Sequence, residues 1–140
     1  MPEVLESPYA STHVSPTLFI FALRYLDKEL ASCVEKELGE YIRRNIALYV
    51  GTLHKAIAMC IEKSKVFKEK KRVIEGVVND VKMYCEEPPV ATIDEFKSDV
   101  ATVLLQESNG SLDEVVEKVI FRWRCWADSC REVSEVEDEE

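Results

Sequence analysis

The longest run of helical periodicity, in residues 34–60, constrains the fold more than any other feature of the chain. Its apolar residues recur at steps of three and four, the spacing that aligns side chains on one face of an α-helix. They are Val34, Leu38, Tyr41, Ile42, Ile46, Tyr49, Leu53, Ala56, Ile57 and Cys60. Such a face must be buried, and the other apolar segments share its period without a clear period of two. The sequence therefore predicts an all-α protein, a compact helical bundle.

The size and composition of the chain fit a single soluble domain. Its 140 residues, 46% of them hydrophobic, can bury about two thirds of the unfolded surface. We expect residues 1–14 to form a flexible arm, residues 15–133 the helical domain and residues 134–140 an acidic tail. Because no apolar run approaches about 18 residues, we expect no membrane anchor.

The charge pattern argues against nucleic acid as a partner. The net charge is −9, whereas phosphate binding needs clustered Lys and Arg side chains. One basic run, residues 63–72, is interrupted by Glu69, and we interpret it as a solvated linker between helices.

The five cysteines form no CxxC pair, and their odd number predicts reduced thiols in a cytosolic protein. They are Cys33, Cys60, Cys85, Cys125 and Cys130. The last two are five residues apart and lie on different sides of a helix, so we expect them to share no metal site.

Cap and stop signals divide the chain into five predicted helices. Ser15 and Pro16 begin the first helix, whose expected buried face extends to Leu30. The second starts near Ser32 and carries the stripe, with Gly51 as the position where it would bend or end, and the third ends before Pro88. Two capping boxes, at residues 92–95 and 111–114, mark the starts of the fourth and fifth helices.

The sequence offers no catalytic constellation. His13 lies in the expected arm and His54 beside the stripe, and neither has a nucleophile at a readable spacing. The four glycines are scattered, so there is no phosphate-binding loop. We expect neither enzymatic activity nor a bound cofactor or metal.

One polar residue, Asn45, falls in the middle of the stripe, between Tyr41, Ile42 and Tyr49. An unpartnered amide is costly to bury at such a position. Two interpretations stay open: Asn45 forms hydrogen bonds within the core, or this part of the stripe faces a wet cleft. The second would make the helix one wall of a groove for an amphipathic partner helix.

Three segments share their order and spacing with one protein family. In residues 17–30 an apolar run leads to a Tyr, an apolar residue and a Lys-x-Leu ending, and in residues 34–49 a Val, a Leu and a Tyr recur at the intervals of the family's second helix. Residues 74–81 read Ile-Glu-Gly-Val-Val-Asn-Asp-Val, similar to the start of its first homology region. Together they resemble the Bcl-2 family of apoptosis regulators. The resemblance covers residues 17–105 and implies a Bcl-2-like bundle with a surface groove.

Several family motifs are absent. The stretch that usually supplies the groove arginine, which pairs with an Asp of the bound helix, reads Cys-Glu-Glu-Pro-Pro-Val at residues 85–90. Ile42 and Arg43 replace the Gly-Asp pair of a BH3 motif, so we do not expect the chain to donate a death ligand. The late Gly-Gly-Trp motif and the membrane tail are also missing. Compact, tail-less members resemble viral homologues, and the resemblance implies a viral protein of iridovirus type.

The resemblance implies an inhibitor of apoptosis that sequesters the BH3 helix of a host pro-apoptotic protein in a hydrophobic groove. The walls of this predicted BH3 groove are Tyr41, Asn45, Leu48, Tyr49, Thr52 and Leu53 on the second helix, with Ile74, Val77, Val78 and Val81 on the third. Plain core packing is the competing interpretation of each apolar member. The expected location is the host cytoplasm, with recruitment to mitochondria by partners.

The alternative is a helical scaffold or adaptor that associates with itself and antagonises host signalling without binding BH3 ligands. The last predicted helix buries one apolar face, yet Phe121, Cys125 and Trp126 add apolar surface outside it. A helix that is apolar on two sides is either central in the bundle or part of a second interface. These three residues are the candidates for a homodimer interface.

Overall fold

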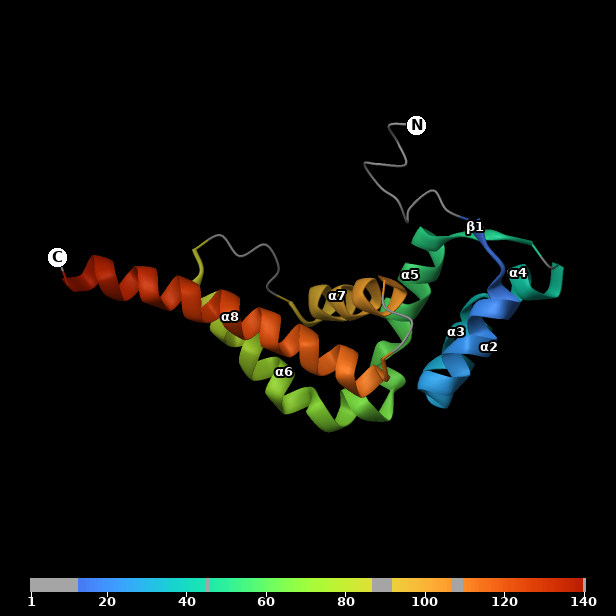
Figure 1. Cartoon of the computed structure of the whole chain (residues 1–140), viewed down its shortest axis with the longest axis horizontal. Coiled ribbons are helices and arrows are strands. Elements are labelled where there is room, and N and C mark those ends of the chain that lie inside the picture. The colour runs from blue at the N-terminus through green and yellow to red at the C-terminus, as the bar shows by residue number, and fades with distance from the viewer. Residues whose placement is uncertain (1–12, 45, 87–91, 107–109, 140) are drawn as a thin grey trace, which may run out of the picture.

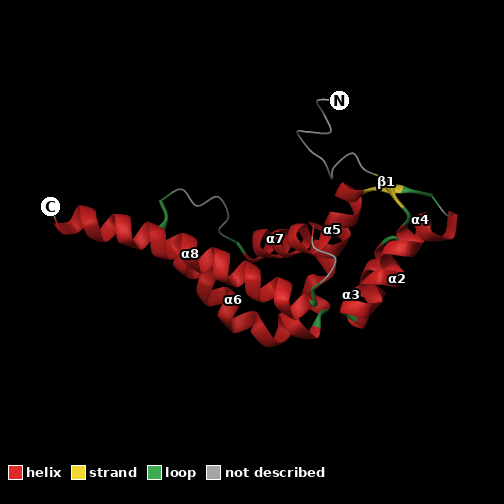
Figure 2. Cartoon of the chain, viewed as in Figure 1, coloured by secondary structure: helices red, strands yellow, loops and turns green. Residues whose placement is uncertain are grey.

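Helices make up most of the structure, a computed structural model that describes residues 13–44, 46–86, 92–106 and 110–139, with side chains between residues 14 and 132. The elements are β1 (His13–Val14), α2 (Pro16–Leu26), α3 (Lys28–Glu37), α4 (Gly39–Arg44), β2 (Leu48–Tyr49), α5 (Val50–Cys60), the 3₁₀ turn η1 (Ile61–Lys63), α6 (Lys65–Tyr84), α7 (Ile93–Gln106) and α8 (Leu112–Glu139). This arrangement confirms the predicted all-α class (Figure 2).

The helices are arranged along an elongated molecule (Figure 1). α2, α3 and α4 form one end, α5 and α7 the middle, and α6 with α8 extends to the other end, where the last turns of α8 project. A continuous cluster of buried side chains connects all of these helices except α4, whose Tyr41 and Ile42 pack against its edge.

Asp27 divides the first predicted helix in two. α2 ends at Leu26, Asp27 has an extended backbone, and its carboxylate accepts the Leu30 amide at 2.9 Å as the N-cap of α3. The prediction of one helix running to Leu30 is therefore wrong. A short carboxylate next to a free amide stabilises a helix start better than a helix interior.

The single long helix predicted from the stripe is also wrong. The helical chain is interrupted after Glu37, and it extends at Leu48 and Tyr49 before α5 begins. There β2 pairs antiparallel with β1, so the last two residues of the predicted arm form a strand, while residues 1–12 lie outside the described part. Stripe residues on both sides of the interruption remain buried, among them Val34 and Ile57. The period therefore persists although the helix does not.

The interruption turns α5 back along α3 and brings Cys33 to Cys60. Their Cα atoms are 5.7 Å apart and the sulfurs form a disulfide. In one straight helix the same residues would be about 40 Å apart. A second disulfide joins Cys85 to Cys130, and Cys125 alone remains a free thiol. The prediction that all five cysteines are reduced is wrong for these four, because an odd number and the absence of a CxxC pair do not prevent residues far apart in the sequence from pairing.

The basic run at residues 63–72 is helical rather than a linker. Ser64 ends η1 and accepts the Phe67 amide at 3.3 Å as the N-cap of α6, whose first two turns contain most of the run. Lys, Arg and Glu are good helix formers, and Phe67 anchors this turn in the core. The lysines therefore project from a packed helix.

α6 and α8 lie side by side and run parallel. Lys70 forms ion pairs with Asp113, at 3.3 Å, and with Glu117, and the Cys85–Cys130 disulfide closes the other end. The hydrogen bond with Glu117 raises the pKa of Lys70, so the ammonium stays charged. α8 continues to Glu139, so the segment predicted as an acidic tail has a helical backbone.

Aromatic side chains fill the centre between α6, α7 and α8. The Phe96 ring packs edge-on against the Trp123 ring, with the ring centroids 5.0 Å apart, and its centroid lies 6.4 Å from that of Phe67. The Trp123 indole N–H donates to the Asp99 carboxylate at 2.8 Å. The hydroxyls of both predicted capping boxes accept the expected amides, at 3.1 and 3.2 Å. The predicted starts of α7 and α8 are thereby confirmed.

We expect the Cys85–Cys130 disulfide to stabilise the fold by about 4 kcal/mol, because it closes a loop of 45 residues that would otherwise gain entropy on unfolding. Denaturant unfolding of a Cys85→Ser, Cys130→Ser double variant tests this expectation. Cys125→Ser is the matched control and should leave the free energy of unfolding unchanged. An equal effect of both changes would contradict the assignment.

Candidate functional site

Most residues of the predicted BH3 groove are buried in the core of the free chain. Leu48, Leu53, Ile74, Val77, Val78 and Val81 are each at most 4% exposed. α5 packs against α3 and α7, whereas α6 packs mainly against α8. The structure therefore does not bring the two predicted walls together as the facing sides of an open groove.

Three other predicted groove residues retain accessible surface near the interruption before α5. Tyr41 and Thr52 are half-buried, and the Tyr49 side chain is 51% exposed. Asn45, whose environment the sequence left open, lies outside the described residues. Tyr49 and Thr52 lie at the start of α5, whereas Tyr41 lies in α4.

The His54 side chain on α5 contacts α7. Its Nε2 atom lies 3.0 Å from the Ser98 carbonyl and 3.0 Å from Thr102 Oγ1, both on α7. The Ser98 hydroxyl lies 3.3 Å from the same nitrogen, and the tautomer of the imidazole decides which of these groups donates. The imidazole therefore joins α5 to α7.

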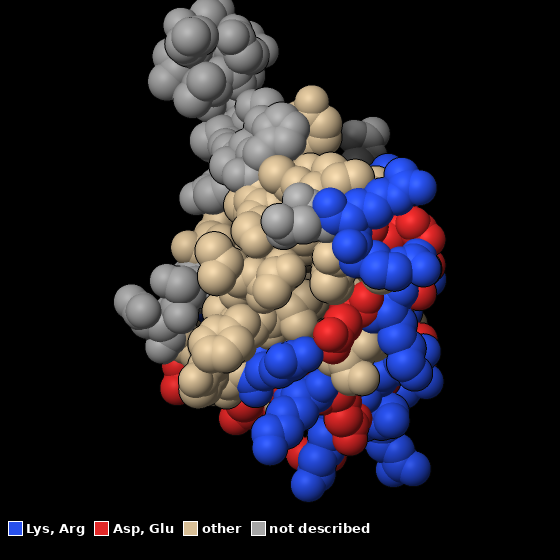
Figure 3. Space-filling model, turned by 90° about the vertical axis from the view of Figure 1, so that its right-hand side faces the viewer, with Lys and Arg blue, Asp and Glu red and all other residues tan. Residues whose placement is uncertain are grey.

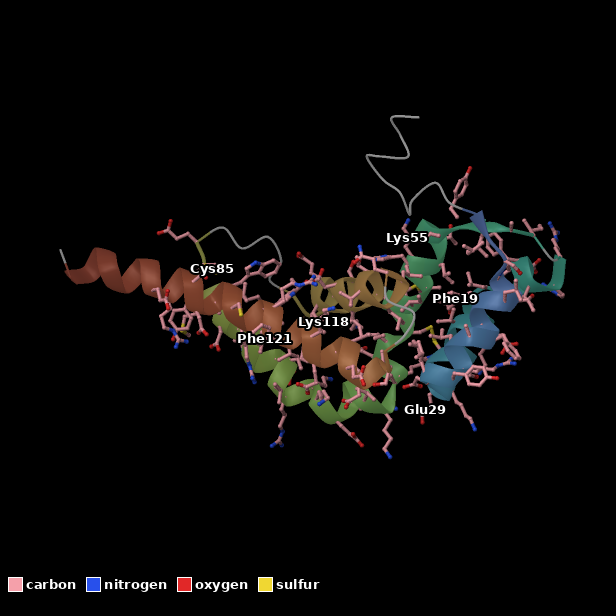
Figure 4. All side chains as sticks on the ribbon, in the orientation of Figure 1. Phe19, Glu29, Lys55, Cys85, Lys118 and Phe121 are labelled. Carbon is pink, nitrogen blue, oxygen red and sulfur yellow. A yellow bond between two sulfur atoms is a disulfide. The ribbon has the colours of Figure 1, made fainter. Side chains whose placement is uncertain are left out.

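The predicted self-association residues divide into two exposed side chains and one packed side chain. Phe121 is 69% exposed and extends from α8 (Figure 4), and the free thiol of Cys125, one turn later, is exposed too. Trp126 is half-buried, with its ring 5.9 Å from Trp123. Phe121 and Cys125 thus share an outer face of α8, and Trp126 belongs with the core.

At the level of Phe121, α6 exposes a glycine and an apolar side chain. The ion pairs of Lys70 and the Cys85–Cys130 disulfide align each α6 residue with one about 45 positions later in α8. This register places Gly76 and Phe121 at about the same level along the two helices, and a Cβ atom at Gly76 would meet no atom within 4 Å. Val73, one turn earlier, is 42% exposed. We call Val73, Gly76, Phe121 and Cys125 the α6/α8 face.

A second exposed apolar set, on α2, was missed at the sequence level. Leu18, Phe21 and Tyr25 are all exposed, whereas Ile20 and Leu23 on the opposite side are buried. The sequence does indicate such a set, because this segment is apolar on nearly every side. A helix at the edge of a bundle can bury only one side, so the other apolar side chains stay exposed.

Two kinds of site do not occur within the described residues. None of their helices is both long and apolar enough to cross a membrane. In the same part of the chain, no three His, Cys, Asp or Glu side chains are grouped so that they could hold a metal ion. The exposed apolar faces are the features that remain to be explained.

No family model, curated protein or solved structure matches the chain. The resemblance to the Bcl-2 family therefore stays a prediction that depends on three short segments. Function has to be argued from the surfaces that the fold buries and those that it leaves exposed.

Charged substitutions in the predicted groove should unfold the protein. Leu53→Glu and Val77→Glu would each bury an unpaired carboxylate, which should lower the free energy of unfolding by at least about 3 kcal/mol. Met59→Glu on α5 and Met83→Glu on α6 are matched controls, because both side chains are largely exposed. Circular dichroism during urea unfolding measures all four. If the Leu53 and Val77 variants are stable and fully helical, the two residues are not core residues and the groove assignment stands.

Proposed function

We propose that this chain is an interaction protein, a helical scaffold or adaptor, that associates with a second copy of itself through the α6/α8 face. The exposure of Phe121 carries the proposal. A phenyl ring that is 69% exposed on a charged helix loses unfavourable hydration when a partner covers it, and aromatic side chains are the usual anchors of interfaces.

The shape of the face supports a symmetric pair. A two-fold axis near this surface would set Phe121 of each copy against the low surface at Gly76 of the other, because the same patch meets itself in such an interface. Val73 would add apolar surface beside the ring. The exposed thiols of the two copies of Cys125 would then lie close to the axis, which offers a direct chemical readout.

Replacing the anchor should dissociate the pair. We expect the native chain to sediment as a dimer and Phe121→Ser to weaken self-association by at least about 2 kcal/mol, roughly 30-fold in Kd. Met83→Ser removes a side chain of similar exposure elsewhere on α6 and should have no effect. Mild oxidation should crosslink the native chain through Cys125 and fail in Cys125→Ser. A strict monomer at high concentration would contradict the proposal.

The second candidate function is capture of a BH3 helix. In that case the chain would be a viral protein of the host cytoplasm, and its partners would be host pro-apoptotic proteins. Its support is the accessible surface of Tyr41 in α4 and of Tyr49 and Thr52 at the start of α5. Because the other described wall residues are buried, a ligand would have to separate α5 from its neighbours. The two disulfides weigh against a reducing cytoplasm, since such bonds persist mainly in oxidising compartments.

Calorimetry with a panel of BH3 peptides tests the second candidate. We expect a Kd between about 10 nM and 10 μM if it is right, the range of a groove of ordinary quality. Replacing the conserved Asp of the peptide by Ala should then cost less than about 0.5 kcal/mol, because the usual groove arginine is missing. No binding to any peptide would leave the scaffold as the only candidate.

A further inference from the structure

The outer side of α2 is an apolar stripe, defined here as Leu18, Phe21 and Tyr25. Their exposed fractions are 72%, 57% and 79%, and their spacing places them on one face of the helix. Phe21 and Tyr25 contact each other edge to face at 5.7 Å. Single exposed apolar residues are ordinary on protein surfaces, but three large ones in a row on one helix mark an interaction site.

Three lysines lie near the Tyr25 end of this stripe. Asp27 follows two residues after Tyr25, and its Oδ2 atom accepts the Ser64 hydroxyl at 3.0 Å. This bond holds the first turn of α3 beside the first turn of α6. Lys28 follows Asp27, and Lys63 and Lys65 flank Ser64, so all three lysines are next in sequence to the two residues of this contact. We call Lys28, Lys63 and Lys65 the basic junction.

Several carboxylates lie close to these lysines. Both oxygens of Asp27 are engaged, one by the Leu30 amide and the other by Ser64. Glu62 pairs with Lys97 at 3.3 Å, and the 3.9 Å pair of Glu69 with Lys65 is solvent-exposed and weak. In the described part of the chain, Lys28 and Lys63 have no ion-pair partner. Glu29, next to Lys28 in the sequence, is exposed as well, so the junction is a mixed surface whose unpaired ammonium groups are those of Lys28 and Lys63.

The stripe and the junction occupy the same end of the elongated molecule. Figure 3 looks at this end and shows uncharged surface beside Lys and Arg side chains that gather along its lower and right edges. The sequence is most acidic at the other end of the molecule, where five of the eight residues 132–139, in the last turns of α8, are Asp or Glu. A negatively charged surface would therefore attract the α2 end and repel the tip of α8.

We infer that the α2 stripe and the basic junction bind the surface of a lipid bilayer that contains anionic phospholipids. Exposed aromatic and aliphatic side chains on one helix can enter the boundary between headgroups and acyl chains, and lysines at their edge attract the lipid phosphates. Tyr25 suits this boundary, where a ring with a polar tip is favoured. A single-stranded nucleic acid fits less well, because Leu18 offers no ring for a base to stack on.

Vesicle co-sedimentation of the full chain tests the inference. The protein should sediment with vesicles of 70% phosphatidylcholine and 30% phosphatidylserine at about 50 mM salt, and much less at about 300 mM, where screening is stronger. It should not sediment with pure phosphatidylcholine. No binding to the anionic vesicles at low salt would overturn the inference.

Three variants separate the contributions. Phe21→Ser with Tyr25→Ser removes the inserted rings, and Lys28→Glu with Lys63→Glu reverses the junction charge. Each pair should weaken vesicle binding at least about tenfold, since one lysine near an anionic membrane changes affinity about fivefold. Lys82→Glu with Met83→Ser is the matched control on an exposed part of α6 and should bind like the native chain. Circular dichroism confirms that all three fold.

Two results would refute the membrane surface. Equal loss in the control pair would show that general charge, not this end of the molecule, determines binding. Vesicle binding that is insensitive to the loss of Phe21 and Tyr25, together with equally tight binding to single-stranded DNA, would identify a site for polyanions instead.

Discussion

The reversal of the chain between α4 and α5 is the constraint on which the rest of the structure depends. It places α5 beside α3, where the Cys33–Cys60 disulfide joins them, and it lets β2 pair with β1. From this position α5 reaches α7 through His54. After η1, the Ser64 hydroxyl donates to the Asp27 carboxylate, and this hydrogen bond connects the start of α6 to the start of α3. Without the reversal, neither the central core nor the basic junction would exist.

The sequence predicts those features that depend on residues close together in the chain. The caps of α7 and α8 follow from a hydroxyl three residues before its amide, and the helical class follows from the period of the apolar residues. The interruption of the helix at Leu48 and Tyr49 could not be predicted from neighbouring residues. Its extended backbone is paired with residues 13 and 14, more than thirty positions earlier, and the stripe stays buried on both sides.

Periodicity also fails to show what covers an apolar face. Val77 and Phe121 were both assigned to surfaces from their register, yet the first is buried against neighbouring helices and the second is exposed. The difference arises from the parallel pairing of α6 with α8, which Lys70 and the Cys85–Cys130 disulfide align. Such a pairing is a property of the whole fold. The same limit explains why the outer side of α2 was missed.

The two exposed apolar faces are separated along the molecule, because the α2 stripe lies at one end and the α6/α8 face lies toward the other (Figure 1). A partner on one face therefore leaves the other accessible. Pairing through Phe121 would present two basic junctions in one particle, and linked sites bind a surface more tightly than either does alone. Self-association and membrane binding would then reinforce each other, which gives a scaffold a physical means of concentrating at a bilayer.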